Sequence, residues 1–475
     1  MKTESKGKKL QESLVHKWHN AWEKLDKKEL DKTLAVSERY KSFLDTGKTE
    51  REANDEIIRI VEENGFKPLD YFIENNKSPV QGTKLYVGNK GKGVALFVIG
   101  NHKLEDGMHI IGSHLDAPRI DLKQFPLYED SELALLKTHY YGGIKKYQWV
   151  TLPLALHGVI VKPNGDKISI VIGEDDKDPV FFITDLLPHL AKDQMDKKMG
   201  DGITGEGLNI LFGSIPYKDD EISDKVKLNI LKILHDRYDI SEGDFTTAEI
   251  EIVPAGKSRD VGIDRSMIGG YGQDDRACVF TSLQAILDID KPQKTAVALF
   301  VDKEEIGSVG NTSMASKFFE NTVAELINLT EKNYSDLILR RALSNSSVLS
   351  GDTLAGFDPN YPDVMDKRNT PYIGRGITLV KYTGSRGKGG SNDANAEYMN
   401  RIRKIFDDNQ VVWQMGELGK VDQGGGGTIA YILANYGMEV VDCGVSLLSV
   451  HGPYEIASKA DIYMTYKGYK AFYEA

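Results

Sequence analysis

The sequence has little cysteine, no long apolar run and no signal-peptide pattern. Its two cysteines, Cys278 and Cys443, stand far apart in the 475 residues, which excludes a disulfide framework and fits a reducing compartment. No run reaches the ~18 apolar residues that a membrane-spanning helix needs. The charged residues 1–20 lack the apolar core of a secretion signal. We therefore expect a cytoplasmic protein that has no membrane partner.

Basic charge is also in short supply. Lysine and arginine together number 60, against 71 aspartates and glutamates, and the formal net charge is -11. A nucleic-acid-binding surface usually needs a basic face, so we expect no nucleic-acid partner. What the chain does have is length and apolar content. Hydrophobic residues make up 40% of it, enough for a large core and for about two or three domains.

Helical and strand-like patterns alternate before about residue 120 and again after about residue 260. This alternation favours an α/β fold, with a mixed, largely parallel sheet sandwiched by helices. Between these regions the pattern changes, because residues 147–161, 167–173 and 247–256 read as strands and only residues 183–198 as a helix. We therefore divide the chain into a discontinuous domain of residues 1–120 and 260–475 and a β-rich domain of residues 121–259.

Five apolar segments break at, or shortly before, residues that can bind a metal. These residues are His114, Asp274, the adjacent pair Glu304 and Glu305, Asp352 and His451. In an open α/β sheet, ligands collect at the carboxyl ends of the strands. Two imidazoles with several carboxylates suit zinc, cobalt or manganese, and three carboxylate ligands allow two metals that share one carboxylate.

Each of these residues also has a simpler interpretation. His114 alone fits a hydrogen-bonded core histidine, and Asp274 fits a helix N-cap. Asp352 fits a turn after glycine, His451 a loop, and Glu304 a solvated turn at a strand end. We favour the metal site because all five breaks would otherwise have to combine this chemistry by coincidence.

The sequence resembles the aspartyl aminopeptidase / aminopeptidase I family of dinuclear metallopeptidases in six motifs. In chain order they are SHLDAPR (113–119), GQDDR (272–276), DKEEIGS (302–308), SGDTLAGFDPNYP (350–362), GGGGTIA (424–430) and SVHGPYE (449–455). The resemblance spans residues 40–475. It implies a zinc-peptidase-like fold and an enzyme that removes single N-terminal residues from peptide substrates. The implied cofactors are two divalent metal ions per chain, zinc in the first place, with cobalt or manganese as alternatives.

The resemblance also implies roles for individual residues. His114 and Asp352 would bind one metal, Glu305 and His451 the other, and Asp274 both. Glu304 would be the general base that takes a proton from the attacking water and relays it to the leaving amine. Asp116 would hydrogen-bond the His114 ring, although a turn before Ala-Pro also explains it.

Two further expectations concern the β-rich region and the chain as an oligomer. Family members carry an assembly domain inserted there, which implies a homo-oligomer, specifically a dodecamer. His157 is a candidate for a histidine that completes the active site of a neighbouring subunit. A buried strand histidine is the alternative, and we favour that alternative.

The family pattern fails in the stretch that follows Asp352. Many members have two histidines there, where this chain has Ala355 and Asp358, and a carboxylate at Asp358 disfavours an acidic substrate side chain. Against that, Arg386 falls where acid-selective members have a lysine that faces the substrate side chain. Arg386 or Lys388 would bind an acidic N-terminal residue through a charge-assisted contact, unless this glycine-rich loop is only solvated.

Two other functions compete with an aminopeptidase. One is a metal-dependent N-acyl amino acid deacylase on the same fold. The other is a non-catalytic scaffold with a structural metal. The adjacent pair Glu304 and Glu305 speaks against a scaffold, because a closed structural site does not need a second carboxylate as a base.

Overall fold

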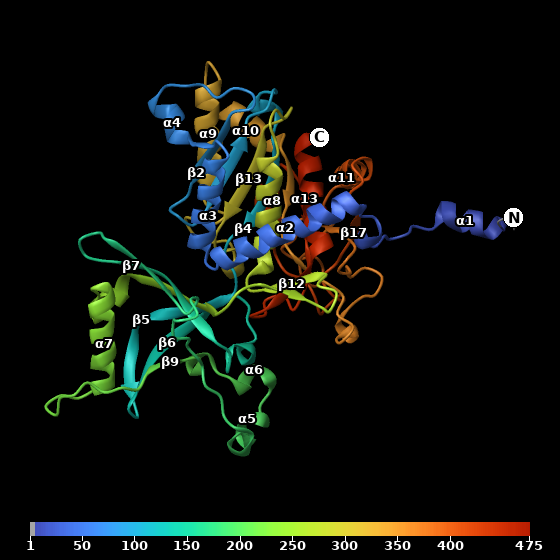
Figure 1. Cartoon of the computed structure of the whole chain (residues 1–475). Helices are drawn as coiled ribbons and strands as arrows, with labels where there is room; N and C mark the ends of the chain where they lie inside the picture. The colour runs from blue at the N-terminus through green and yellow to red at the C-terminus, as the bar shows by residue number, and fades with distance from the viewer. Residues whose placement is uncertain (1–4) are drawn as a thin grey trace.

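The structure is a computed structural model that describes residues 5–475 (Figure 1). Its strands form three sheets of nine, six and five strands, and the fold is mixed α/β. The helices within the described residues are α1 (Lys6–Leu14), α2 (Lys27–Thr46), α3 (Glu50–Glu63), α4 (Leu69–Glu74), α5 (Lys192–Met195), α6 (Met199–Gly202), α7 (Lys225–Tyr238), α8 (Gln273–Leu287), α9 (Phe318–Thr330), α10 (Asp336–Ser344), α11 (Ala396–Asp408), α12 (Ala430–Ala434) and α13 (Lys459–Glu474).

The nine-stranded sheet contains four adjacent parallel strands at its centre. Its order is β1 (Lys67–Pro68), β2 (Lys84–Gly88), β3 (Val94–Val98), β13 (Ala296–Val301), β4 (His109–His114), β14 (Ser347–Ser350), β18 (Glu439–Gly444), β16 (Ile377–Val380) and β17 (Trp413–Met415). The pairs β13–β4, β4–β14 and β14–β18 are parallel, whereas β3 and β16 join this block antiparallel. The carboxyl ends of the four central strands therefore lie at one edge of the sheet.

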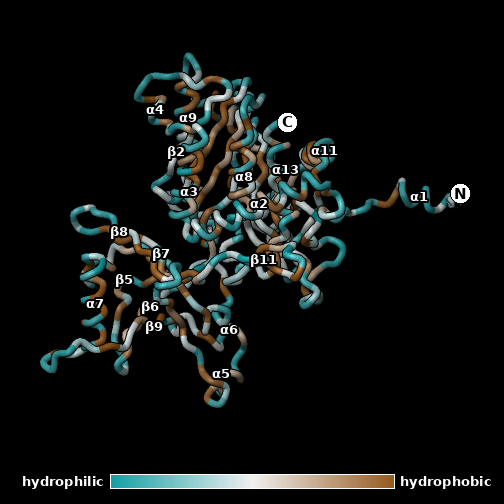
Figure 2. Tube along the Cα trace, viewed as in Figure 1, coloured by the Kyte–Doolittle hydropathy of each residue, from teal (hydrophilic) through white to brown (hydrophobic). Residues whose placement is uncertain are grey.

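Both faces of this sheet are covered. Side chains alternate along β3, so that Val94, Leu96 and Val98 join one core cluster while Ala95 and Phe97 join another. The first cluster also contains residues of α2, α3, α8, α11 and α13, and the second contains residues of α4, α9, α10 and α12. Figure 2 shows the central strands as hydrophobic along most of their length, as burial on both faces requires.

The six-stranded sheet is antiparallel and is made by strands between residues 119 and 254. Its order is β8 (Lys167–Ile172), β7 (Leu154–Val161), β10 (Ala248–Pro254), β5 (Arg119–Asp130), β6 (Leu133–Tyr141) and β9 (Ile210–Gly213). It has its own core cluster, to which α7 contributes Val226 and Leu234, and it lies beside the larger unit in Figure 1. The division at residues 121 and 259 stays a prediction.

The five-stranded sheet connects segments from the second half of the chain. Its order is β11 (Arg259–Val261), β12 (Met267–Gly270), β20 (Glu455–Ser458), β19 (Ser446–Leu448) and β15 (Leu354–Ala355). It positions the segments that precede Asp274 and His451. Within residues 5–475, no helix combines the length and apolar character needed to cross a membrane.

The prediction of a helix at residues 183–198 is wrong. Only two short helical turns form there, Pro188–Leu190 and α5. Pro188 has no backbone N–H and cannot continue a helix that started before it. The first helical turn of the segment therefore starts at Pro188.

Candidate metal centre

Three predicted metal ligands and the predicted general base stand at the ends of neighbouring strands. His114 is the last residue of β4, Glu304 and Glu305 begin the short helix Glu304–Ile306 after β13, and Asp352 follows β14. Because β13, β4 and β14 are adjacent and parallel, these side chains meet at one edge of the nine-stranded sheet.

Asp274 and His451 come from the five-stranded sheet, and one buried carboxylate ties their backbones together. Asp274 follows β12 at the start of α8, and His451 follows β19. Glu455 Oε2 accepts from the Asp274 N–H at 3.0 Å, and Glu455 Oε1 accepts from the His451 N–H at 2.8 Å. Glu455 therefore fixes the distance between the two segments.

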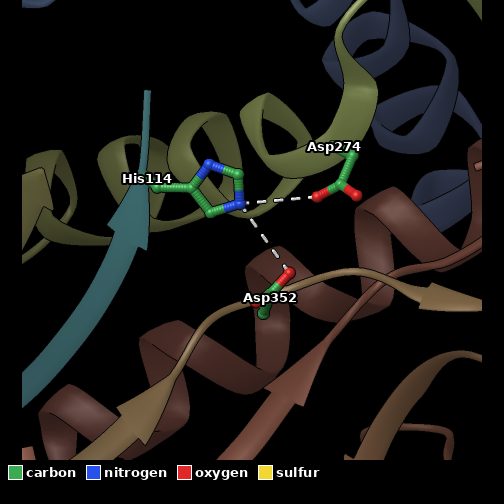
Figure 3. Close-up of side chains that lie close together, drawn as sticks. All are labelled: His114, Asp274 and Asp352. Carbon is green, nitrogen blue, oxygen red and sulfur yellow. Dashed lines mark ion pairs between the residues drawn. The ribbon is translucent and has the colours of Figure 1, made fainter. Parts of the chain in front are cut away.

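The first cluster consists of His114, Asp274 and Asp352 (Figure 3). His114 Nε2 lies 3.5 Å from Asp274 Oδ1 and 3.9 Å from Asp352 Oδ1, and the three side chains point toward one another. One potential ligand atom from each residue lies within 4.8 Å of the others. Asp352 comes from the segment that follows β14, and Asp274 comes from the start of α8.

The second cluster consists of Asp274, Glu305 and His451. His451 Nε2 lies 3.2 Å from Asp274 Oδ2 and 3.4 Å from Glu305 Oε1. Asp274 thus belongs to both clusters and turns one carboxylate oxygen toward each histidine. This is the arrangement that a shared carboxylate between two cations needs.

The residues fit a metal site on two observations. Asp274 Oδ1 is buried and has no hydrogen-bond partner within residues 5–475, and a buried carboxylate oxygen without a partner is costly unless a cation neutralises it. The donors are imidazole nitrogens and carboxylate oxygens, the set that zinc accepts in catalytic sites. Both observations hold at the same pair of clusters.

The ring nitrogens are oriented for metal binding. His114 Nδ1 lies 2.9 Å from the Asp116 carbonyl oxygen, and His451 Nδ1 lies 2.9 Å from the Gly143 carbonyl oxygen. A carbonyl only accepts, so each Nδ1 carries a proton, and Nε2 is the nitrogen that faces each cluster and could bind a metal there. Burial disfavours a second proton, but the Asp274 and Glu305 carboxylates outweigh it and raise the pKa of His451 to about 10. The clusters therefore attract positive charge strongly.

Glu304 stands apart from both clusters but faces the same space. Burial raises the pKa of Glu304 to about 7, with Asp274 and Asp116 adding to the effect and the two histidine rings opposing it. A base whose pKa is near the working pH transfers protons efficiently. Nearby cations would favour its ionised form.

Asp116 holds the loop that carries Glu304 and Glu305. Its carboxylate is buried and accepts from the Glu304 N–H and the Glu305 N–H, both at 3.1 Å. Asp116 Oδ1 also lies 3.4 Å from His114 Nδ1, while the carbonyl oxygen of Asp116 is closer to that ring. Asp116 therefore contacts both a candidate ligand and the backbone of the candidate base.

A cavity of about 1000 Å³ opens onto the clusters. Its lining includes His114, Asp274, Glu304, Glu305, Asp352 and His451. The remaining charged residues of the lining are Lys145, Asp358 and Asp442, and apolar residues such as Leu354, Val380 and Leu447 also line the cavity. The cavity is large enough for the first residues of a peptide.

The sequence profile described as "Aminopeptidase I zinc metalloprotease (M18)" matches residues 43–473. The chain belongs to this family. It is a metal-dependent aminopeptidase, and its family is one of zinc metalloproteases. A Clostridium acetobutylicum protein named "Probable M18 family aminopeptidase 1" is 57% identical over 459 residues, 97% of this chain and 98% of its own.

Solved structures of M18 aminopeptidases share the fold of this chain. The crystal structure of aminopeptidase I from Clostridium acetobutylicum has a TM-score of 0.89 at 52% identity and covers 97% of this chain and 100% of its own. The M18 aminopeptidase crystal structure from Thermotoga maritima has a TM-score of 0.92 at 45% identity, covering 97% and 99%.

Two predicted site residues of this M18 aminopeptidase lie elsewhere. His157 is buried in β7, where Nδ1 lies 2.7 Å from Glu52 Oε1 and Nε2 lies 3.0 Å from Glu174 Oε1. Both ring nitrogens thus have partners in their own chain. Arg386 stands on an exposed loop with φ +53° and is not among the described residues that line the cavity.

Three residues that support the site were missed from the sequence. Glu455 lies in the SVHGPYE motif, where a carboxylate four residues after His451 was the available signal. Tyr141 donates its hydroxyl to Asp116, and Gly143 accepts from His451. These two residues come from the end of β6, far from every motif in sequence, and nothing in their residue types indicated a role.

Proposed function

We propose that this aminopeptidase holds two zinc ions and hydrolyses the N-terminal peptide bond of its substrate. The substrate would bind between the two zinc ions and Glu304. The observation that carries the proposal is Asp274, which turns one carboxylate oxygen toward each of two histidines. His114 and Asp352 would complete one site, and Glu305 and His451 the other. Bound zinc would polarise the scissile carbonyl and make water a better nucleophile at neutral pH.

The protein's own residues would supply the proton transfers. Glu304 would accept a proton from the attacking water and donate it to the leaving amine as the peptide bond breaks. Asp116 would keep this carboxylate in place through the N–H groups of Glu304 and Glu305. A base that is already held in place loses less conformational entropy when it contacts the attacking water than a mobile base does.

Removal of zinc is expected to abolish activity. Exhaustive dialysis against a chelator should eliminate hydrolysis of a leucyl or glutamyl p-nitroanilide, because the Lewis acid contributes several kcal/mol. Titration with zinc should restore activity with close to two equivalents per chain, measured by elemental analysis. An N-acetylated version of the same substrate is the control and should stay intact, since an aminopeptidase needs a free N-terminus. Activity that survives chelation unchanged would refute the proposal.

We also propose a preference for acidic N-terminal residues, with Lys145 as a second candidate for the residue that recognises them. Lys145 lines the cavity, whereas Arg386 lies outside the lining. A charge-assisted contact of ~1.5–3 kcal/mol corresponds to roughly 10- to 150-fold in kcat/KM. Lys145→Ala is therefore expected to reduce the glutamyl-to-leucyl ratio of kcat/KM by at least about 10-fold.

Arg386→Ala is the matched variant for this measurement, and a smaller change is expected from it. Asp358 and Asp442 are negative charges in the same lining and oppose an acidic side chain. A lysyl substrate that reacts faster than the glutamyl one would show that these carboxylates dominate, and would end the acidic proposal.

We propose further that the chain forms a cytoplasmic homo-oligomer, specifically a dodecamer. One structure of the same fold, at 21% identity, is described as the S. cerevisiae mApe1 dodecamer. In this chain the segment around α5 and α6 exposes Leu186, Leu190, Met195 and Met199, each by more than half of its side chain. Large apolar residues exposed so close together in sequence would suit a contact surface between subunits. A monomer in light scattering at micromolar concentration would contradict the proposal.

A further inference from the structure

The last residue of β6, Tyr141, and the two glycines after it form a turn, residues 141–143, that reaches the metal centre from the six-stranded sheet. Tyr141 Oη donates to Asp116 Oδ2 at 2.8 Å, and the Gly143 carbonyl accepts from His451 Nδ1 at 2.9 Å. We propose that this turn is a positioning element for the cluster of Asp274, Glu305 and His451. The inference rests on the proposed function, because it assigns a supporting role to residues that hold candidate ligands.

The hydroxyl of Tyr141 completes the set of donors around Asp116. The Asp116 carboxylate is buried and otherwise accepts from the backbone N–H groups of Glu304 and Glu305. Three donors fix the plane of a carboxylate better than two. Because Oδ2 accepts from both Tyr141 and Glu305, the hydroxyl acts directly on the hydrogen bond that places the Glu305 backbone.

The ring of Tyr141 is itself held from the opposite side. Arg119, its cross-strand partner on β5, places its guanidinium carbon 3.9 Å from the centre of the ring. The Arg119 side chain is buried and lies within 3.5 Å of carboxylate oxygens of Glu50, Asp121 and Glu251. The hydroxyl is therefore aimed at Asp116 by an ion network that belongs partly to the six-stranded sheet.

The two glycines let the backbone approach the cluster. Gly142 has φ +72°, and a Cβ there would lie 3.3 Å from both Cβ and Oε2 of Glu305. A Cβ on Gly143 would lie 3.3 Å from His451 Nδ1. Both contacts are tighter than side chains normally accept, so a Cβ at either position would shift Glu305 or His451, and the positive φ at Gly142 favours glycine there in addition.

The contacts of the turn are unequally distributed over the two clusters. They reach Glu305 and His451 directly, and through Asp116 they reach the Glu305 backbone and the His114 ring. Among the described residues, no hydrogen bond joins Asp352 to residues 141–143. Loss of the turn's contacts should therefore weaken one zinc site more than the other. A residue that only stabilised the fold would not distinguish between them.

Zinc titration of the full-length chain against a competing chelator tests the inference. In Tyr141→Phe, which keeps the ring beneath Arg119, the zinc site of Asp274, Glu305 and His451 is expected to lose about 10- to 100-fold in affinity, as for other residues that orient metal ligands. The site of His114, Asp274 and Asp352, which the turn reaches only through Asp116, should lose less affinity. At saturating zinc, kcat should recover in large part and KM should stay within about twofold, because the defect lies in zinc affinity and substrate binding is not involved.

Tyr140→Phe is the matched control, since Tyr140 precedes Tyr141 on β6 and is 41% exposed. It should bind zinc as the wild type does. Gly143→Ala disturbs the same cluster through His451 alone and should reproduce the selective loss. Wild-type affinities in Tyr141→Phe or Gly143→Ala, or an equal loss at both sites, would overturn the inference. A wild-type chain that bound fewer than two zinc ions would instead remove the proposed function, and this inference with it.

Discussion

Replacement of Glu304 by glutamine is expected to lower kcat by about 10²- to 10⁴-fold, the contribution typical of a positioned general base. Glutamine keeps the size of the side chain and its place in the cavity but cannot accept the proton of the attacking water. Zinc content should stay at the wild-type value, because Glu304 belongs to neither ligand cluster. Steady-state kinetics at saturating zinc, combined with elemental analysis of the same sample, measure both quantities.

Glu305→Gln is the matched variant, because it makes the same chemical change one residue away. Glu305 Oε1 lies 3.4 Å from His451 Nε2, so this variant should lose zinc from the second cluster. Its activity should recover in part when zinc is added in excess, whereas the activity of Glu304→Gln should not. If Glu304→Gln lost zinc and Glu305→Gln kept it, the two roles would have to be exchanged.

The second large effect is expected from Asp274→Asn, which should reduce both zinc affinities together. Asp274 is the residue that the two clusters share, and asparagine offers one neutral oxygen in place of two charged ones. Loss of the Lewis acid contribution of ~4 kcal/mol corresponds to a fall in kcat/KM on the order of 10³-fold. Chelator competition and kinetics on the purified variant measure the two effects.

Two other substitutions make this measurement specific. Asp352→Asn should weaken one zinc site and spare the other, because Asp352 belongs to one cluster only. Asp358→Asn removes a carboxylate from the same cavity without touching either cluster and should keep two zinc ions. An Asp274→Asn variant that still bound two zinc ions with wild-type affinity would contradict the shared-ligand arrangement.

The positions of the strand-end residues were predictable from the sequence, because they depend only on where an apolar run of neighbouring residues ends. An apolar run such as residues 296–301 forms a buried strand, and a polar residue directly after it must emerge at the carboxyl edge. His114, Glu305 and Asp352 could therefore be expected near one another. Family resemblance supplied the pairing of ligands, which periodicity alone leaves open.

Other features were not predictable because they depend on contacts between distant segments. Tyr141 and Gly143 reach the centre only because β6 pairs with β5, which begins shortly after Asp116. Their residue types are common, and no motif surrounds them. The position of the Arg386 side chain depends on the course of a glycine-rich loop, and glycine permits too many backbone conformations for the sequence to select one.

The order of the candidate ligands along the chain has a consequence for biosynthesis. Strand β13 pairs with β3 and β4, which lie on the other side of the six-stranded sheet in sequence, so the nine-stranded sheet cannot close until β13 has left the ribosome. Under the assignment proposed above, His114 precedes the six-stranded sheet in sequence, and the other ligands, from Asp274 to His451, follow it. A chain synthesised only as far as the six-stranded sheet would therefore hold one ligand of the set. The metal centre would form only after the segment that carries His451 had folded onto the rest.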